Sequence, residues 1–557
     1  MKKLWFCLVS VLLAGVLVFS PASAVFSPHP FRDVKEKDWF SGAVAYTYQQ
    51  GLFHGVSADR FEPNGVVTRA MVVTVLANLS GVKGEEASEQ HFLDVPLDRW
   101  YASSVEWAAR YAIVSGVGGF LFQPNAPATR EQIAAILYRY ACCTGNDVSA
   151  AAQAPSFRDY SQVSHYAREA MDWAVGKGIL HGESAAVLNP RGIATRAQLA
   201  QILYSARNVL CKKTIQTEPV SLPLPSKIDR LLSGMTLEEK VGQLFLPRCP
   251  GSGAAALTKS LQPAGYTLYA RDFQGKTKAE VQAMARSLQE SAKTPLLIAV
   301  DEEGGTVVRV SSNPKLASAP FASPQEIYQK GGLEGIRADT EAKAGLLLEL
   351  GINLNLAPVC DVSTDPGDYM YSRTIGVPAS ETAGVIGAMV ETMEEKNLSG
   401  ALKHFPGYGG NLNTHTGISV DNRPYEQFQK EDFLPFAAGI RAGAPSVLVS
   451  HNIVTAMDPQ KPASLSKPVH ELLREELSFT GVIMTDDLSM DAIKLYTGGQ
   501  SPAVAAFLAG NDLLLTSDWS EDYQALLTAA KNGAVPQKRV EESVRRILEW
   551  KETKGLL

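Results

Sequence analysis

The stretch LLIAVDEEGG (residues 296–305) decides the fold of the second half of this 557-residue chain. An apolar run of this length is typical of a strand buried on both faces, and the acidic residues and glycines behind it end the strand. Comparable runs recur at 352–359, 446–451, 481–487 and 511–516, separated by amphipathic stretches such as EDYQALLTAAKNG (521–533). This alternation predicts an α/β domain, and its length fits a (β/α)8 TIM barrel, with a doubly wound sheet as the alternative.

Polar side chains fall where apolar runs end: Asp301, Asp361, His451 and Asp486 at the ends of the runs above, and Lys403 and His404 after LSGAL (398–402). In a (β/α)8 barrel the carboxyl ends of the strands converge on one face, where catalysis occurs. Carboxylates, histidines and arginines that converge without metal-ligand spacing indicate acid–base or nucleophilic chemistry on a polar, uncharged substrate.

Composition and the N-terminus limit the cellular setting. A net charge of -6 gives no electrostatic case for nucleic acid. Lys2 and Lys3 precede an apolar run, and Ala22-Ser23-Ala24 has the small-x-small pattern of a cleavage site, so residues 1–24 are predicted to be a secretory signal peptide. An uncleaved anchor is the alternative; no other stretch is apolar enough to cross a membrane.

The remaining cysteines are scattered and odd in number: Cys142, Cys143, Cys211, Cys249 and Cys360. They form no disulfide framework and no CxxC zinc pattern. We expect single buried thiols.

Three repeated segments precede the barrel, beginning at Phe31, Phe92 and Phe157. In each, an aspartate (Asp33, Asp94, Asp159) and an arginine (Arg69, Arg130, Arg196) keep an almost constant separation. Each repeat is predicted to hold two helices, the second capped by Thr68, Thr129 or Thr195. The prolines of 211–226 indicate an extended linker.

The repeats resemble the S-layer homology (SLH) domain of proteins displayed at bacterial surfaces. We therefore expect an α-rich module with SLH repeats at 25–85, 86–148 and 149–210, followed by the linker and a barrel at 227–557. The resemblance implies that Arg69, Arg130 and Arg196 bind anionic groups of a secondary cell-wall polysaccharide, because guanidinium groups suit carboxylates. Alternatively, each arginine only braces its own repeat.

Several barrel motifs resemble glycoside hydrolase family 3: MTLEEKVGQLF (235–245), DEEGGTVVR (301–309), GINLNLAPVCDV (351–362), SRTIG (372–376), KHFPGYG (403–409) and TDDLSM (485–490). The resemblance is to the β-N-acetylhexosaminidase branch, which has a single barrel. The β-glucosidase branch usually adds an α/β domain, for which we expect no room before Leu557.

This resemblance implies specific roles. Asp486 would be the nucleophile of a retaining mechanism, with its neighbour Asp487 structural and the SDW motif at 517–519 a coincidence. The substrate would be held by Asp301, Arg309, Arg373, Lys403, His404 and His451, for each of which a purely structural ion pair is the alternative.

In this branch the acid–base is a loop histidine paired with an aspartate two residues earlier. Here NTH stands in that place, so His415 would be the general acid/base and Asn413 would orient it. Because asparagine supplies no charge to stabilise a protonated imidazole, we expect slower hydrolysis than with aspartate.

Together these patterns predict a secreted, cell-wall-attached exo-β-N-acetylglucosaminidase acting on peptidoglycan-derived or chitin-like glycans, with no metal or organic cofactor. An N-acetylglucosaminide phosphorylase or another β-glycosidase of the same family is one alternative. A non-catalytic surface-layer or glycan-binding protein is another.

Overall fold

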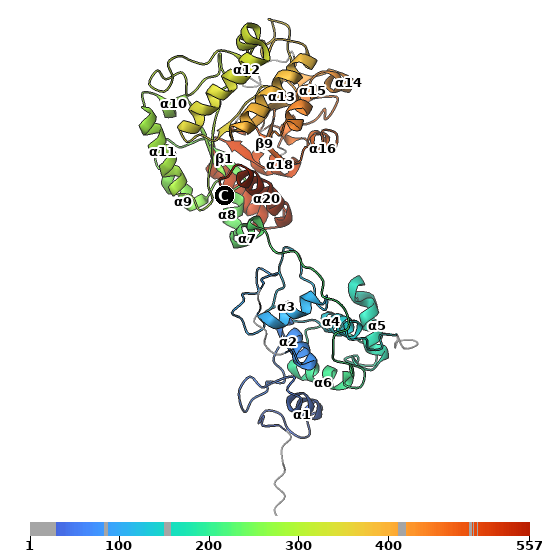
Figure 1. Ribbon diagram of the computed structural model, residues 1–557. Helices are drawn as coiled ribbons and strands as arrows, with labels where there is room; N and C mark the ends of the chain where they lie inside the picture. Colours follow the sequence, from blue (N-terminus) through green and yellow to red (C-terminus); the bar gives the residue numbers. More distant parts are fainter. Residues whose placement is uncertain are drawn as a thin grey trace, which may run out of the picture. The chain divides into compact units, whose positions relative to one another are not determined.

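The computed structural model describes residues 29–82, 87, 89–149, 157–409, 419–489, 493, 495–497 and 499–557. The chain divides into two compact units, the first ending at Ser226 and the second running Lys227–Leu557 (Figure 1). The predicted signal peptide lies outside the described residues.

The first unit is built from three pairs of helices: α1 (Ser41–Gln49) and α2 (Arg69–Ser80), α3 (Ala102–Arg110) and α4 (Arg130–Cys143), and α5 (Arg168–Gly176) and α6 (Arg196–Ala206). Two 3₁₀ helices, η1 (Tyr160–Gln162) and η2 (His165–Ala167), precede α5. The second helix of each repeat packs on the first helix of the next, α2 on α3, α4 on α5 and α6 on α1. The repeats thus form a closed ring around a shared apolar core.

The threonine caps are confirmed. The side-chain oxygens of Thr68, Thr129 and Thr195 accept hydrogen bonds from Met71 N, Gln132 N and Gln198 N at the starts of α2, α4 and α6. Each cap satisfies a backbone N–H that has no partner within its helix. Residues 211–226 of the predicted linker contain no helix or strand, and the first part of the linker is held to the unit, for example by Gln216 N donating to Cys143 O at 2.8 Å.

In the described residues of the second unit, eight parallel strands form the barrel: β1 (Phe245–Pro247), β2 (Gly265–Leu268), β3 (Leu297–Val300), β4 (Leu354–Asn355), β5 (Ser399–Phe405), β7 (Ser446–Val449), β9 (Val482–Thr485) and β10 (Leu514–Thr516). Six of them pair in the order β2-β3-β4-β5-β7-β9, and β1 pairs with β10. Parallel bridges at Arg248–Thr267 and Met484–Leu513 join β1 to β2 and β9 to β10. The ring therefore closes, which confirms the barrel and excludes the doubly wound sheet.

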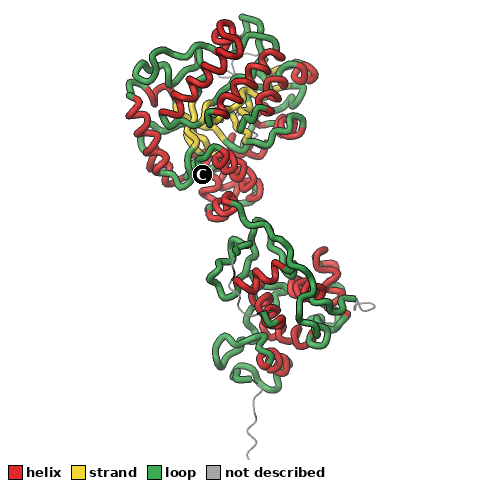
Figure 2. Tube along the Cα trace, in the orientation of Figure 1, coloured by secondary structure: helices red, strands yellow, loops and turns green. Residues whose placement is uncertain are grey.

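Helices follow the strands and surround the sheet (Figure 2). They are α9 (Ala254–Leu261), α10 (Ala270–Phe273), α11 (Lys278–Glu290), α12 (Pro324–Glu349), α13 (Ala379–Glu395), α14 (Tyr425–Lys430), α15 (Phe433–Arg441), α16 (Lys467–Glu475), α18 (Pro502–Ala509), α19 (Trp519–Lys531) and α20 (Gln537–Thr553). The helices α7 (Lys227–Gly234) and α8 (Leu237–Gly242) precede β1, and η3 (Tyr371–Arg373) and η4 (Ala463–Leu465) lie in connections. The short strands β6 (Val420–Asp421) and β8 (Ile453–Val454) pair apart from the barrel.

The prediction that all the cysteines are buried is wrong in part. Cys143, Cys249 and Cys360 are buried free thiols, whereas Cys142 and Cys211 are exposed. Cys142 lies on the face of α4 that also carries Tyr138 and Arg139, which are only partly buried, whereas Cys143 lies on the buried face.

A lysine of α20, Lys551, is buried against the residues that precede β1. Lys551 donates to Gln243 Oε1 at 2.8 Å, and Gln243 in turn donates to the carbonyl of Gln262 at 2.7 Å. Among the described residues no acidic side chain pairs with Lys551, and burial lowers its pKa to about 7. The folded protein therefore holds this lysine uncharged at alkaline pH.

The free energy of unfolding is expected to rise with pH relative to that of Lys551→Met. In the unfolded chain the lysine keeps its proton up to about pH 10.4. The folded lysine releases its proton near pH 7. The unfolded state therefore binds more protons between these values, and wild type gains up to about 1.4 kcal/mol per pH unit over the variant. Denaturant titrations from pH 7 to 9 measure this difference; parallel curves would contradict it.

Candidate functional site

The carboxyl ends of the strands surround a cavity of about 440 Å³. Six of the predicted site residues line it, namely Asp301, Arg309, Arg373, Lys403, His404 and Asp486. They come from segments spread between residues 301 and 486, which the closed barrel brings together. Most of the residues that the sequence predicted for the site therefore lie in one cavity.

A network of four charged groups forms the base of the cavity. Lys403 Nζ lies 2.7 Å from Asp301 Oδ1 and 2.6 Å from Glu303 Oε1. Arg373 makes a bidentate pair with Glu303, Nε to Oε2 at 2.9 Å and Nη2 to Oε1 at 2.7 Å. Two cations and two carboxylates therefore balance, and their donors and acceptors are fixed before a substrate enters.

Pairing outweighs burial in setting the charges of this network. Burial alone would raise the pKa of Glu303, but Lys403 and Arg373 bring it down to about 2. Burial alone would lower the pKa of Lys403, but Asp301 and Glu303 raise it above its ordinary value. Glu303 was not among the predicted site residues; the only signal was its position in DEEGG two residues after Asp301.

Asp486 directly follows β9 and lines the cavity half-buried, with its backbone N–H donating to Val449 O at 3.1 Å. The next carboxylate is engaged differently: Asp487 accepts from the Ser517 hydroxyl at 2.7 Å and from Ser489 N at 3.0 Å. These contacts join the turn after β9 to the end of β10. Asp518 of the SDW motif is exposed at the start of α19.

Tyr269, which follows β2, is a second cavity residue that the sequence did not indicate. Arg248 lies over its ring, 4.6 Å from the centroid. Burial raises the pKa of the phenol well above its usual value, and the carboxylates Asp487, Asp301 and Asp486 raise it further. Tyr269 therefore remains a neutral hydrogen-bond donor beside the acidic side of the cavity.

His451 does not line the cavity. It is buried after β7, where Nδ1 lies 2.8 Å from Ser464 Oγ and Nε2 lies 3.1 Å from the carbonyl oxygen of Asp487. The structure thus places it behind the turn that carries Asp486, and its predicted contact with substrate gains no support.

His415 and Asn413 lie outside the described residues, but both ends of their segment are held. The carbonyl of Gly407 accepts from Asn452 Nδ2 at 3.3 Å, and at the other end the carbonyl of Asp421 accepts from Thr455 N at 2.9 Å. Gly407 has φ +126°, and a Cβ atom there would lie 2.1 Å from Asp432 Oδ1. Only glycine fits that position.

The three repeat arginines are buried and reach into the neighbouring repeat rather than bracing their own. Their Nε atoms donate to backbone carbonyls: Arg69 to Phe122 at 2.9 Å, Arg130 to Leu188 at 3.1 Å and Arg196 to Phe61 at 2.7 Å. A further donor of each contacts the carbonyl of Ser115, His181 or His54. The arginines therefore join the ring of repeats, and their predicted role in polymer binding remains a prediction.

A groove of about 270 Å³ lies beside Arg69 in this unit. Arg139 and Gln132 of α4 and Tyr166 of the third repeat also line it. Arg139 is half-buried and was not among the predicted residues. The Arg139 guanidinium places a positive charge in the groove, which the aromatic ring of Tyr166 also lines.

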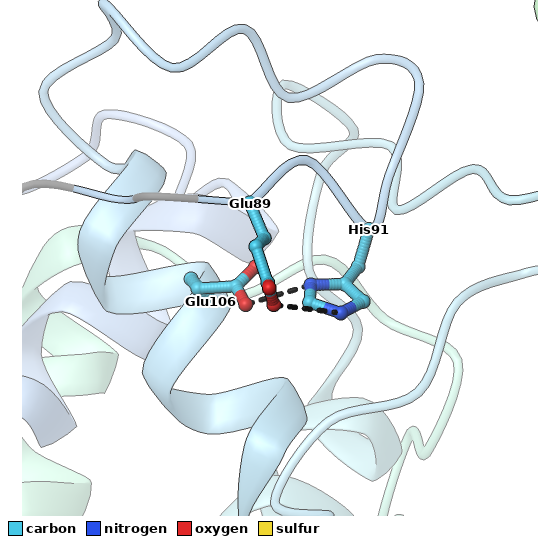
Figure 3. Close-up of side chains that lie close together, drawn as sticks. All are labelled: Glu89, His91 and Glu106. Carbon is cyan, nitrogen blue, oxygen red and sulfur yellow. Dashed lines mark ion pairs between the residues drawn. The ribbon is translucent and has the colours of Figure 1, made fainter. Parts of the chain in front are cut away.

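Within the described ranges, one group of side chains has spacing suited to a metal ion: Glu89, His91 and Glu106 of the second repeat (Figure 3). His91 Nδ1 lies 2.6 Å from Glu106, whereas Nε2 faces Glu89 at 3.6 Å. Arg110 donates to both carboxylates, at 3.2 and 3.4 Å. Because each imidazole nitrogen faces a different carboxylate and one guanidinium donates to both carboxylates, the arrangement is an ion-pair network, and we assign no metal to it.

In the part of the chain that the structure describes, no helix is both long and apolar enough to span a membrane.

Comparisons with known proteins agree with this geometry. Residues 236–550 match the glycosyl hydrolase family 3 N terminal domain, and residues 30–70, 91–134 and 156–200 match the S-layer homology domain. A β-hexosaminidase of Xanthomonas campestris pv. campestris (strain B100) is 34% identical over 260 residues, which cover 45% of this chain and 76% of that protein.

Two solved structures are similar to the barrel. A glycoside hydrolase family 3 β-N-acetylglucosaminidase from Paenibacillus sp. str. FPU-7 is 29% identical with a TM-score of 0.54, covering 58% of this chain and 63% of that one. A β-N-acetylhexosaminidase from Beutenbergia cavernae DSM 12333 is 28% identical with a TM-score of 0.51, covering 58% of this chain and 99% of that one.

The family match extends over the whole barrel and includes every strand that contributes to the cavity. It therefore covers the same residues whose side chains converge there. The chain belongs to glycosyl hydrolase family 3 and carries three S-layer homology domains before its barrel.

Proposed function

We propose that this glycoside hydrolase is an exo-β-N-acetylglucosaminidase that removes terminal non-reducing N-acetylglucosamine from peptidoglycan-derived or chitin-like glycans at the cell surface. The observation that carries the proposal is the position of Asp486 beside the network of Asp301, Glu303, Arg373 and Lys403 in one cavity. A fixed set of donors and acceptors beside a carboxylate can hold a sugar ring for attack at its anomeric carbon. The activities of the similar hexosaminidases favour the acetamido sugar.

The proposed mechanism combines the position of Asp486 with the role that the sequence predicts for His415. An oxygen of Asp486 attacks the anomeric carbon while the glycosidic oxygen leaves with a proton from His415, which gives a covalent glycosyl-enzyme. His415 then takes a proton from water, whose oxygen displaces Asp486 and retains the anomeric configuration. Asp301, Lys403, Arg373 and His404 hold the sugar hydroxyls, and Arg309 lines the same cavity.

The mature protein should hydrolyse a chromogenic β-N-acetylglucosaminide and leave the matching glucoside and xyloside intact. Free N-acetylglucosamine as the product, with or without added phosphate, would support hydrolysis. Sugar 1-phosphate formed with phosphate would favour the phosphorylase. No reaction with any glycoside, with retained binding to cell walls, would favour the non-catalytic glycan-binding protein.

The SLH domains support attachment to the cell surface, and we propose that an anionic secondary cell-wall polysaccharide occupies the groove beside Arg69. Secretion by the predicted signal peptide would bring the chain to that location. Arg139 offers the groove a cation, whereas Arg69 is occupied by carbonyls of the next repeat.

Replacing Arg139 by alanine is expected to weaken binding of the full chain to purified cell-wall polysaccharide on the order of 10-fold, because one charge-assisted hydrogen bond is lost. The variant should keep its glycosidase activity and its unfolding midpoint. Calorimetric titration at two salt concentrations measures the effect, with the exposed Arg191→Ala as the matched control. Unchanged affinity in Arg139→Ala would place the polymer elsewhere.

A further inference from the structure

Asp361 lies directly behind His404 and is 1% exposed. Its Oδ1 accepts from Tyr408 N at 2.8 Å, and its Oδ2 accepts from His404 N at 3.3 Å. The same Oδ2 lies 2.7 Å from His404 Nδ1. Because both of its oxygens receive backbone N–H groups, Asp361 acts as a hydrogen-bond acceptor toward its neighbours. Nδ1 must therefore carry the proton that it donates to Asp361.

The other imidazole nitrogen faces the cavity side. His404 Nε2 lies 3.4 Å from Arg373 Nη2, and a guanidinium can only donate. Two donors cannot face each other, so Nε2 carries a lone pair rather than a second proton. Because Nη2 already donates to Glu303 at 2.7 Å and its contact with Nε2 is long, the lone pair keeps most of its capacity for another donor.

We propose that Asp361 is a positioning residue that holds His404 as the Nδ1-protonated tautomer, so that Nε2 accepts a hydrogen bond from a free hydroxyl of the bound sugar. This inference rests on the proposed function. Lys403 and Arg373 donate hydrogen bonds to hydroxyl oxygens, whereas His404 Nε2 accepts a hydrogen bond and therefore needs a hydroxyl that donates one. The site therefore selects a sugar that is unsubstituted at this position, since an ether oxygen or a fluorine cannot donate.

The test uses inhibition of the full-length enzyme by free monosaccharides, which bind without reacting. N-acetylglucosamine is compared with its deoxy and deoxyfluoro analogues at the 3-, 4- and 6-positions. At one position the fluoro analogue is expected to inhibit about 10-fold or more weakly than the parent, and no better than the deoxy analogue, because a donated hydrogen bond is lost. Fluoro analogues as potent as the parent at every position would overturn the proposal.

Asp361→Asn provides the second arm. Its amide can donate to Nδ1 and so allow the Nε2-protonated tautomer, in which the ring donates to the sugar. The fluoro-to-parent ratio is then expected to fall several-fold toward unity, and Asp365→Asn, an exposed neighbour, should keep the wild-type ratio. A purely structural role would weaken all inhibitors by one common factor and leave the ratio unchanged, which would overturn the proposal.

A direct measurement covers the case in which Asp361→Asn does not fold. Nitrogen-15 spectra are recorded for wild type labelled at histidine, and the His404 signals are assigned by their loss in His404→Gln. They should show that Nδ1 of His404 is protonated and Nε2 is not. A protonated Nε2 with an unprotonated Nδ1 would refute the proposal. If wild type neither hydrolyses an N-acetylglucosaminide nor binds the monosaccharide, the proposed function fails, and this inference with it. An active wild type that accepts the fluoro analogues refutes this inference alone.

Discussion

Asp486→Asn is expected to lower kcat for a chromogenic β-N-acetylglucosaminide on the order of 10⁴- to 10⁶-fold, the range seen when a catalytic nucleophile is removed. The amide has nearly the shape of the carboxylate but cannot form the covalent intermediate. Because Asp486 is half-buried at the cavity, the change should leave the unfolding midpoint nearly unchanged. Steady-state kinetics and thermal unfolding measure the two effects.

Asp518→Asn is the matched control for this prediction, because Asp518 follows the neighbouring strand β10 but is exposed. It should retain nearly full activity. A small external nucleophile such as formate should partly restore turnover in Asp486→Ala, since it can take the place of the missing carboxylate. Substantial activity in Asp486→Asn, or its loss in Asp518→Asn, would assign the nucleophile to another carboxylate.

Glu303→Gln is expected to lower both stability and activity. Glu303 is 4% exposed and pairs with Lys403 and Arg373, so the substitution leaves an excess positive charge buried at the base of the cavity. Breaking such a buried pair costs about 3–5 kcal/mol of unfolding free energy. The value of kcat/KM should also fall, because the donors that hold the sugar lose their fixed positions. Denaturant unfolding and kinetics at one pH test both effects.

A second substitution separates the effect of the excess buried charge from the effect of losing the fixed hydrogen-bond donors. Glu303→Gln with Lys403→Met restores the balance of charges, so it should recover part of the stability but none of the activity. Glu326→Gln, whose partner Lys330 is exposed, should change stability by less than about 1 kcal/mol. Equal losses for Glu303→Gln and Glu326→Gln would contradict the role assigned to the buried network.

Much of the architecture could be predicted from local sequence patterns. The caps Thr68, Thr129 and Thr195 each bind a backbone N–H only a few residues further along the chain, so the sequence alone was enough to predict them. The strands β3, β5 and β9 were visible as apolar runs with polar ends. By contrast, β1 and β2 were missed, because three or four residues such as FLP and GYTL carry too little periodicity to distinguish a strand from a loop.

The partners of the polar side chains could not be predicted in the same way. Glu303 meets Arg373 from 70 residues away, and Asp361 meets His404 from 43 residues away. His451 shares the strand-end pattern of Lys403, yet its ring turns behind the cavity to Ser464 and the Asp487 carbonyl. A strand-end position fixes which face of the barrel a residue occupies, but packing against later segments decides which way its side chain points.

The sequence by itself determined the three repeats, the barrel and the strand ends that carry its chemistry, because periodicity, caps and breaks act over a few neighbouring residues. The tertiary structure alone decided that Glu303 balances two cations, that Asp361 orients His404, and that each repeat arginine supports the next repeat. Those pairings depend on closure of the barrel and of the ring of repeats. Closure brings distant charges within about 3 Å, where burial makes an unpaired partner costly.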